Sequence, residues 1–211
     1  MREGRFISLE GPDGGGKTTQ AARLVARLRE RGRNVVTVRE PGGTELGEWV
    51  RRVVQHGATG EPLSATTELL LFSAARRHLT ERVIAPALRE GRWVVSDRFL
   101  DSTTVYQGIA GGLRPEEVAA VHRIAVGEEL PDLTLVLDVD PERGLARLHS
   151  RAGGGELDEM ERRAVDFHRR VREGYRQLAK AEPRRVRLID ASPSAEAVAA
   201  AIWKEVAPLV G

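Results

Sequence analysis

Cysteine is absent from this 211-residue sequence, aromatic residues make up only 4% of it, and lysine occurs at only three positions, 17, 180 and 204. The lack of cysteine excludes disulfide bonds, thiolate zinc sites and a cysteine nucleophile. No apolar run approaches the roughly 20 residues that a membrane-spanning helix needs, and the N-terminal residues lack the apolar stretch of a secretory signal. We therefore expect a cytoplasmic protein without membrane partners.

A strong charge imbalance is also missing. The 33 lysine and arginine residues are nearly balanced by 31 aspartate and glutamate residues, so the chain has no broad positive field that would attract nucleic acid. Most of the basic residues are arginine, whose guanidinium group binds phosphate through paired hydrogen bonds. The composition therefore favours small phosphorylated ligands, and the length predicts a single domain over residues 1–211.

Five short apolar runs, rich in β-branched residues, predict buried parallel strands at 6–9, 35–38, 93–96, 133–137 and 186–189. Helical patterns occupy 18–31, 45–55, 66–90, 115–127, 141–149, 158–181 and 194–209. This alternation predicts an α/β fold, in which a five-stranded parallel sheet is flanked by helices. Ligands of such sheets bind at the carboxyl edge of the strands.

The segment G-P-D-G-G-G-K-T at 11–18 matches the P-loop pattern G-x-x-x-x-G-K-[ST] and lies between a predicted strand and a predicted helix. Its glycines let backbone N–H groups surround phosphate oxygens, Lys17 can reach the β- and γ-phosphates, and Thr18 can ligate Mg²⁺. A glycine-rich turn is the alternative, which the strand and helix disfavour. The predicted ATP-binding residues are Gly11, Pro12, Asp13, Gly14, Gly15, Gly16, Lys17 and Thr18.

A P-loop does not by itself name a reaction, since GTPases, ATPases and small-molecule kinases share it. The sequence has no N-K-x-D string of the kind that reads guanine in translational-type GTPases. On the P-loop alone, enzymes of the adenylate-kinase type remain possible.

Two further segments place polar and aromatic residues where a second ligand can bind. The string R-E-P-G-G-T at 39–44 follows a predicted strand, and Arg51 on the next helix can clamp an anion or remain in solvent. Phe72 and Arg76 share a helix face at spacing i, i+4, which suits a stacked base. Taken alone, such residues more often belong to the core and to the solvated surface.

The third predicted strand ends at Asp97 and Arg98. An aspartate at this position suits Mg²⁺ or its water shell, and the neighbouring arginine can neutralise phosphoryl charge. A structural ion pair is the alternative.

A later helix carries Arg143, Arg147 and Arg151 on one face, where their mutual repulsion favours an anion such as a triphosphate. A solvated basic face is the alternative. Three glycines follow at 153–155, and we expect the segment 143–160 to form a lid that closes over ATP and excludes water.

Along nearly its whole length the sequence resembles bacterial thymidylate kinases. The resemblance rests on the P-loop, on R-E-P-G-G-T at 39–44, on F-S-A-A-R at 72–76, and on D-R-F at 97–99 with S-x-x-x-Y-Q-G at 102–108. It implies the P-loop nucleoside monophosphate kinase fold, phosphorylation of dTMP to dTDP with Mg·ATP in dTTP synthesis, and a homodimer. The alternatives are a kinase for another nucleoside monophosphate or a deoxynucleoside, and a nucleotide-dependent P-loop switch.

The resemblance also implies roles for single residues. Phe72 is expected to stack on thymine, and Arg76 to bind its O4. Arg51 is expected to hold the phosphate of dTMP, and Tyr106 to pack against its deoxyribose. The expected dTMP-binding residues are Asp13, Glu40, Pro41, Arg51, Phe72, Arg76, Arg98, Ser102, Thr103, Tyr106 and Gln107, and the expected metal ligands are Thr18 and Asp97.

Thymidylate kinases supply a catalytic arginine from the P-loop or from the lid, and the variable P-loop positions here contain no arginine. The resemblance therefore implies a lid arginine. The expected catalytic residues are Lys17, Arg98, Arg147, Arg151 and Asp13. Where relatives often read D-R-x-E, this sequence reads D-E-M-E at 158–161. Asp158 and Glu161 are candidates for a place near the metal, or for a helix cap and a surface acid.

Overall fold

Five parallel strands form one sheet in the computed structural model, which describes residues 4–56, 60–152, 161 and 163–211. The strands are β1 (Phe6–Glu10), β2 (Val35–Arg39), β3 (Trp93–Asp97), β4 (Leu133–Asp138) and β5 (Val186–Asp190), in the order β2-β3-β1-β4-β5. All five predicted strands are confirmed, because each was a short apolar run between charged or glycine-rich segments.

Strand β1 lies in the middle of the sheet, and all five of its residues are buried. Leu9 pairs with Asp97 of β3 on one side and with Leu135 of β4 on the other. The carboxyl ends of β1 and β3 therefore lie next to each other at one edge. The P-loop follows β1 directly, so it lies at the switch point where ligands of open α/β sheets bind.

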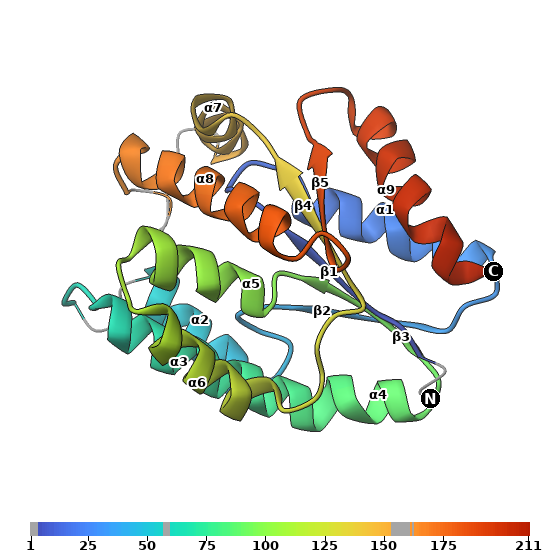
Figure 1. The fold of residues 1–211 in the computed structure, drawn as a ribbon, viewed down its shortest axis with the longest axis horizontal. Coiled ribbons are helices and arrows are strands. Elements are labelled where there is room, and N and C mark those ends of the chain that lie inside the picture. Colours follow the sequence, from blue (N-terminus) through green and yellow to red (C-terminus); the bar gives the residue numbers. More distant parts are fainter. Residues whose placement is uncertain (1–3, 57–59, 153–160, 162) are drawn as a thin grey trace.

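Helices cover both faces of the sheet, as Figure 1 shows. They are α1 (Lys17–Glu30), α2 (Glu45–His56), α3 (Ala65–Leu79), α4 (Ala85–Arg89), α5 (Leu100–Thr103), α6 (Pro115–Val126), α7 (Pro141–Ala152), α8 (Val165–Ala181) and α9 (Ala195–Val210), with π-helical segments η1 (Thr80–Ile84) and η2 (Thr104–Ala110). None of the helices in these described ranges is long and apolar enough to cross a bilayer.

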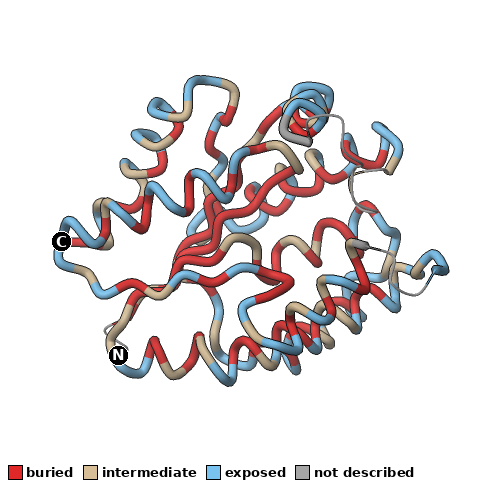
Figure 2. The backbone as a smooth tube through the Cα atoms, turned by 180° about the vertical axis from the view of Figure 1, so that it is seen from behind, coloured by how far each residue is buried: buried red, intermediate tan, exposed pale blue. Residues whose placement is uncertain are grey.

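The core consists of apolar layers on the two faces of the sheet. Helices α1 and α9 bury Leu28 and Val206 against one face, while α3 and α4 bury Leu79 and Leu88 against the other. Burying one such side chain contributes roughly 1.5–3 kcal/mol. Figure 2 shows the buried strands in the middle of the molecule and exposed positions along the outer sides of the helices. These layers hold the strand ends in place.

Two helix predictions need correction, and two helical segments were not predicted. The segment predicted as one helix at 66–90 contains the π-helical turn η1, because Pro86 at the start of α4 has no N–H to donate to an α-helical bond. The helix predicted from 158 begins at Val165, since Ala164 has an extended backbone; residues 158–160 lie outside the described residues. Helices α5 and η2 were not predicted, because their threonines and valine have low helix propensity.

Candidate active site

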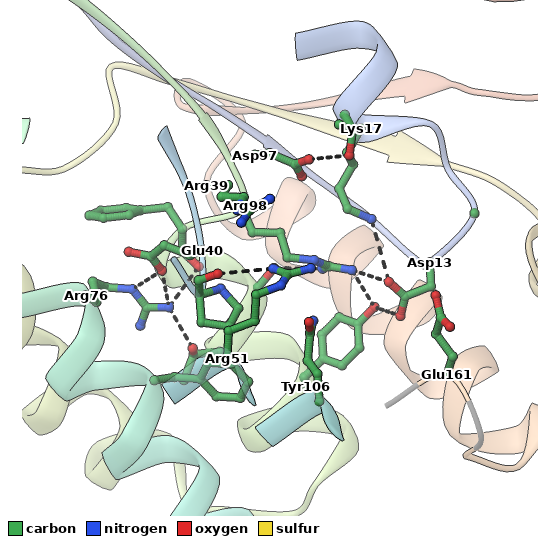
Figure 3. Close-up of a pocket in the computed structure, with 18 of the residues that line it drawn as sticks. Asp13, Lys17, Arg39, Glu40, Arg51, Arg76, Asp97, Arg98, Tyr106 and Glu161 are labelled. Atoms are coloured by element: carbon green, nitrogen blue, oxygen red, sulfur yellow. Dashed lines mark hydrogen bonds and ion pairs between the residues drawn. The ribbon is translucent and has the colours of Figure 1, made fainter. Parts of the chain in front are cut away.

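A cavity of about 280 Å³ opens at the carboxyl edge of the sheet. Its wall combines the P-loop, the loop after β2, helices α2 and α3, the end of β3, and helices α5 and η2. The predicted site residues in this wall are Asp13, Gly14, Gly16, Lys17, Thr18, Glu40, Pro41, Arg51, Phe72, Arg76, Asp97, Arg98, Ser102, Thr103, Tyr106 and Gln107. Figure 3 shows the labelled side chains around this space. The structure therefore brings the P-loop and the predicted acceptor residues into one cavity.

Four of the predicted site residues do not line the cavity. Gly11, Pro12 and Gly15 belong to the P-loop but are not in the cavity wall, and neither is Arg147 of α7. Arg151 also belongs to α7, and its side chain lies outside the described residues.

The P-loop curves around the start of α1. Gly14 and Gly16 have positive φ angles of 74° and 87°, which a side chain would strain. Lys17 is buried, and its Nζ donates to the carbonyl oxygens of Gly11 (3.0 Å) and Pro12 (2.9 Å). Burial and the positive charge of Arg98 lower the pKa of Lys17 to about 8, although Asp13 and Asp97 act in the opposite direction. A bound anion would restore its proton.

Thr18 and Asp97 provide the oxygen atoms that Mg²⁺ prefers. The Thr18 hydroxyl donates to Oδ2 of Asp97 at 2.6 Å, which brings the end of β3 against the start of α1. Among the residues that the structure describes, no group of three or more His, Cys, Asp or Glu side chains gathers as a protein-only metal site. Mg²⁺ in nucleotide sites is usually held by one or two protein groups together with phosphates and water. The pair therefore fits a Mg²⁺ ion that arrives with a nucleotide.

Arg98 lies at the centre of the cavity wall, between the P-loop and the acceptor residues (Figure 3). Its φ of 71° is the one positive value at a non-glycine residue in the described ranges, and such backbone costs about 1–3 kcal/mol. The guanidinium forms an ion pair with Asp13 and donates to Ser102 Oγ at 3.0 Å. The Tyr106 hydroxyl also donates to Asp13, at 2.7 Å.

The pKa of Asp13 falls to about 2. Burial alone would raise it, but the positive charges of Arg98 and Lys17 and the hydrogen bond from Tyr106 outweigh burial. Asp13 is therefore ionised at neutral pH and can accept a hydrogen bond from a ligand hydroxyl, while its low basicity makes it a poor general base.

Glu40 and Arg76 form a buried ion pair on the far side of the cavity. Arg76 Nε donates to Glu40 Oε2 at 2.7 Å, and Nη2 donates to Thr103 Oγ1 at 2.9 Å. Burial raises the pKa of Glu40 to about 7 in spite of Arg76. Glu40 Oε1 and Arg76 Nη1 have no hydrogen-bond partner among the described residues. Because unpaired buried polar atoms are costly, this part of the wall is suited to a ligand with its own donors and acceptors.

Helix α7 begins against the P-loop. A Cβ atom at either Gly14 or Gly144 would collide with the main chain of the other segment. Arg147 donates to the carbonyl oxygen of Gly14 at 3.3 Å and to that of Ala191 at 3.2 Å. The base of the expected lid therefore contacts the phosphate-binding loop and the loop after β5.

The cavity wall also includes Thr19, Arg39, Gln55, Phe99 and Leu148, which the sequence analysis did not select. Three of them had a local signal: Arg39 and Phe99 belong to the strings R-E-P-G-G-T and D-R-F, and Gln55 follows Arg51 by one helical turn. Glu161, a candidate for a place near the metal, lies in the wall as well.

A family model described as thymidylate kinase matches residues 9–202. The chain belongs to the thymidylate kinase family. It is 49% identical to the thymidylate kinase of Synechococcus sp. (strain JA-3-3Ab), over 96% of this chain and 95% of that protein. It is 46% identical to that of Bradyrhizobium sp. (strain ORS 278), over 96% and 89%. The crystal structure of thymidylate kinase from Ehrlichia chaffeensis superposes with a TM-score of 0.76 at 32% identity, covering 96% of this chain and 98% of that one.

These similarities confirm the predicted family, the fold and the reaction. As a thymidylate kinase, the chain phosphorylates dTMP to dTDP with ATP as the phosphoryl donor.

The lowered pKa of Lys17 predicts how ATP binding to this thymidylate kinase depends on pH. Free Lys17 loses its proton as the pH rises through about 8, while the triphosphate favours the charged form. ATP affinity should therefore fall by up to about tenfold per pH unit between pH 8 and 10, with proton uptake on binding. Isothermal titration calorimetry in two buffers of different ionisation heat measures both quantities.

The matched variant is Lys17→Met, which should bind ATP weakly and without this pH dependence. A constant affinity of the wild-type protein from pH 8 to 10 would contradict the prediction.

Proposed function

We propose that the cavity holds both substrates of this thymidylate kinase, with the ATP phosphates on the P-loop and dTMP between Phe72, Arg76 and Tyr106. The observation that carries the proposal is the single cavity that joins the P-loop to the Glu40–Arg76 pair. Arg98 lies between the two ends (Figure 3), where the transferred phosphoryl group would lie. This arrangement suits direct in-line transfer, with no covalent intermediate on the protein.

At the donor end, the backbone N–H groups of the P-loop and the charge of Lys17 bind the phosphates. Thr18 and Asp97 would hold a Mg²⁺ ion, whose charge, when it is bound, balances that of the β- and γ-phosphates. Their hydrogen bond at 2.6 Å keeps the two oxygen donors together. The residues at this end therefore place the γ-phosphate towards Arg98.

At the acceptor end, the ring of Phe72 stacks on thymine and the unpaired Nη1 of Arg76 donates to a base carbonyl oxygen. Asp13, held by Tyr106, accepts from a hydroxyl of the deoxyribose. Arg51, which donates to the Pro41 carbonyl oxygen at 3.1 Å, holds the phosphate of dTMP. Among the remaining predicted wall residues, Ser102 and Thr103 accept hydrogen bonds from Arg98 and Arg76, and Gln107 donates to Glu68 at 2.8 Å.

Catalysis then depends on positive charges of the protein that are in place before the reaction begins. Burial lowers the pKa of the half-buried Arg98, but Tyr106 and Asp13 raise it well above its usual value, so the guanidinium stays charged. A fixed positive charge at this position stabilises the spreading negative charge of the transferred phosphoryl group. Arg98 and Lys17 supply that charge, and both face Oδ1 of Asp13.

The acceptor site predicts a selective effect of Phe72→Ala. Stacking of a base on an aromatic ring contributes roughly 1–3 kcal/mol, so the KM for dTMP should rise about ten- to hundredfold while the KM for ATP changes little. An ADP-release assay with dTMP, dUMP, dCMP, dGMP, AMP and no acceptor measures this. Wild-type turnover should be strong with dTMP and weaker with dUMP.

Trp203→Ala is the matched control, because Trp203 packs against α1 on the other face of the sheet. It should leave the KM for dTMP unchanged. ADP release that does not depend on the acceptor would instead support a nucleotide-hydrolysing switch.

We also propose that a lid arginine acts in the transfer. Arg147 is held by the carbonyl oxygens of Gly14 and Ala191, a position that supports a role on the ATP side. Arg147→Ala should therefore raise the KM for ATP more than it lowers kcat. Arg151→Ala should lower kcat by about 10³ or more, by comparison with arginine fingers. Steady-state kinetics of both single variants and the double variant separate these effects.

Arg143→Ala is the control, because Arg143 shares the helix face and lies near Asp190; it should have a smaller effect than either. If Arg147→Ala and Arg151→Ala, singly and together, left kcat intact, the lid would not supply the catalytic arginine.

We further propose that the protein is a homodimer through α3 and α6. These helices pack against each other and expose Leu70 (56%) and Ile124 (74%), and exposed apolar side chains of this size favour a protein contact. Leu70→Glu with Ile124→Glu should shift the mass measured by light scattering from two chains to one. Leu188→Glu, at the exposed edge strand β5, should leave the mass unchanged, and a wild-type protein with the mass of one chain would contradict the proposal.

A further inference from the structure

Glu10 is a fully buried acid at the end of β1, and the transfer scheme above does not use it. Burial and the nearby Asp101 raise its pKa, which shows that its charged form is costly at this position. An apolar side chain would cost less free energy to bury at the centre of the sheet than this carboxylate does. A buried acid that opposes folding in this way is typical of a functional site.

Four donors converge on the two oxygens of Glu10. Oε1 accepts from Ser8 Oγ at 3.1 Å and from the Phe99 N–H at 2.7 Å. Oε2 accepts from Ser102 Oγ at 2.5 Å and from the Tyr175 hydroxyl at 3.0 Å. The donors come from β1, from the turn after β3, from α5 and from α8, so this one carboxylate connects four elements next to the cavity.

Two of the four hydrogen bonds to Glu10 help to set the position of Arg98. Its strained backbone lies between two hydrogen bonds to β1, because the Arg98 N–H donates to the Leu9 carbonyl oxygen at 2.9 Å and the next N–H, of Phe99, donates to Glu10. The turn can therefore keep the left-handed conformation of Arg98. Without Glu10, the Phe99 N–H would be buried without an acceptor.

Ser102 forms the second link between Glu10 and Arg98. Its hydroxyl donates to Glu10 and accepts from Nη1 of Arg98 at 3.0 Å. The other terminal nitrogen, Nη2, is paired with Asp13. The guanidinium is thus held at one end by Asp13 of the P-loop and at the other by Ser102, whose own orientation depends on Glu10.

We infer that Glu10 is a positioning residue for phosphoryl transfer: through the Phe99 N–H and the Ser102 hydroxyl it holds Arg98 where the transferred group passes. The inference rests on the proposed role of Arg98 in transfer. Glu10 does not line the cavity and need not touch either substrate. Its effect should therefore appear in kcat rather than in substrate binding.

Glu10→Gln tests this inference with little change of shape. The amide offers one acceptor oxygen in place of two, so on one side an N–H donor faces a group that donates to the carboxylate in the wild-type protein. We expect kcat to fall about tenfold or more, because a small misplacement of a catalytic group is costly, while the KM values for dTMP and ATP change less than about threefold. Ser102→Ala should reproduce part of the loss in kcat if the Gln variant folds poorly.

A double-mutant cycle with Arg98→Ala separates positioning from general damage. Glu10→Gln should have little further effect on kcat when Arg98 is already absent. The matched control is Asp101→Asn, because Asp101 is as deeply buried (1% exposed) but binds Arg185 at 2.6 and 2.8 Å. It should lower the unfolding temperature, and any effect that it has on kcat should be the same with and without Arg98.

Two results would overturn the inference. One is a Glu10→Gln variant with a lower unfolding temperature and an unchanged kcat, measured well below that temperature. The other is an equal loss of kcat in the wild-type and Arg98→Ala backgrounds. Neither result bears on the proposed role of Arg98 itself. The Arg98→Ala variant tests that role, and an unchanged kcat in this variant would overturn it.

Discussion

The ion pair between Arg98 and Asp13 joins the two halves of the active site. Asp13 belongs to the loop that follows β1, and Arg98 to the turn that follows β3, so the pair exists only because these strands are neighbours in the sheet. Its charges also set the protonation of the site, since Arg98 lowers the pKa values of both Asp13 and Lys17. Donor binding, acceptor binding and charge neutralisation thus share one electrostatic unit.

The polar groups of this site lower the stability of the fold. The strained backbone of Arg98, the buried Glu10 and the buried Glu40–Arg76 pair each oppose folding. The apolar layers on both faces of the sheet offset these costs, because they bury whole leucine, isoleucine and valine side chains. The separation is spatial: the apolar layers cover the faces of the strands, while the charged groups gather at one edge.

The parts that could be predicted from the sequence have local signals. The strands were visible because their residues are mostly apolar and β-branched, and the P-loop because its glycines, Lys17 and Thr18 are close together in the chain. Helix α5 and segment η2 had no such signal, since they form by packing against α6 and α8 rather than from helix propensity. The start of α8 was misplaced for a similar reason, because polar residues near 160 suit a helix and a turn equally well.

By itself, the sequence determined the fold class, the family and the types of residue at the site, since apolar runs and motifs are properties of neighbouring residues. Only the tertiary structure showed that Arg76 uses two of its nitrogens to bind Glu40 and Thr103, that Arg147 is held by main-chain carbonyl groups, and that Glu10 accepts from the Phe99 N–H beside Arg98. These partners are separated by many residues along the chain, and the order of the strands brings them together. Contacts of that kind leave no trace in local sequence patterns.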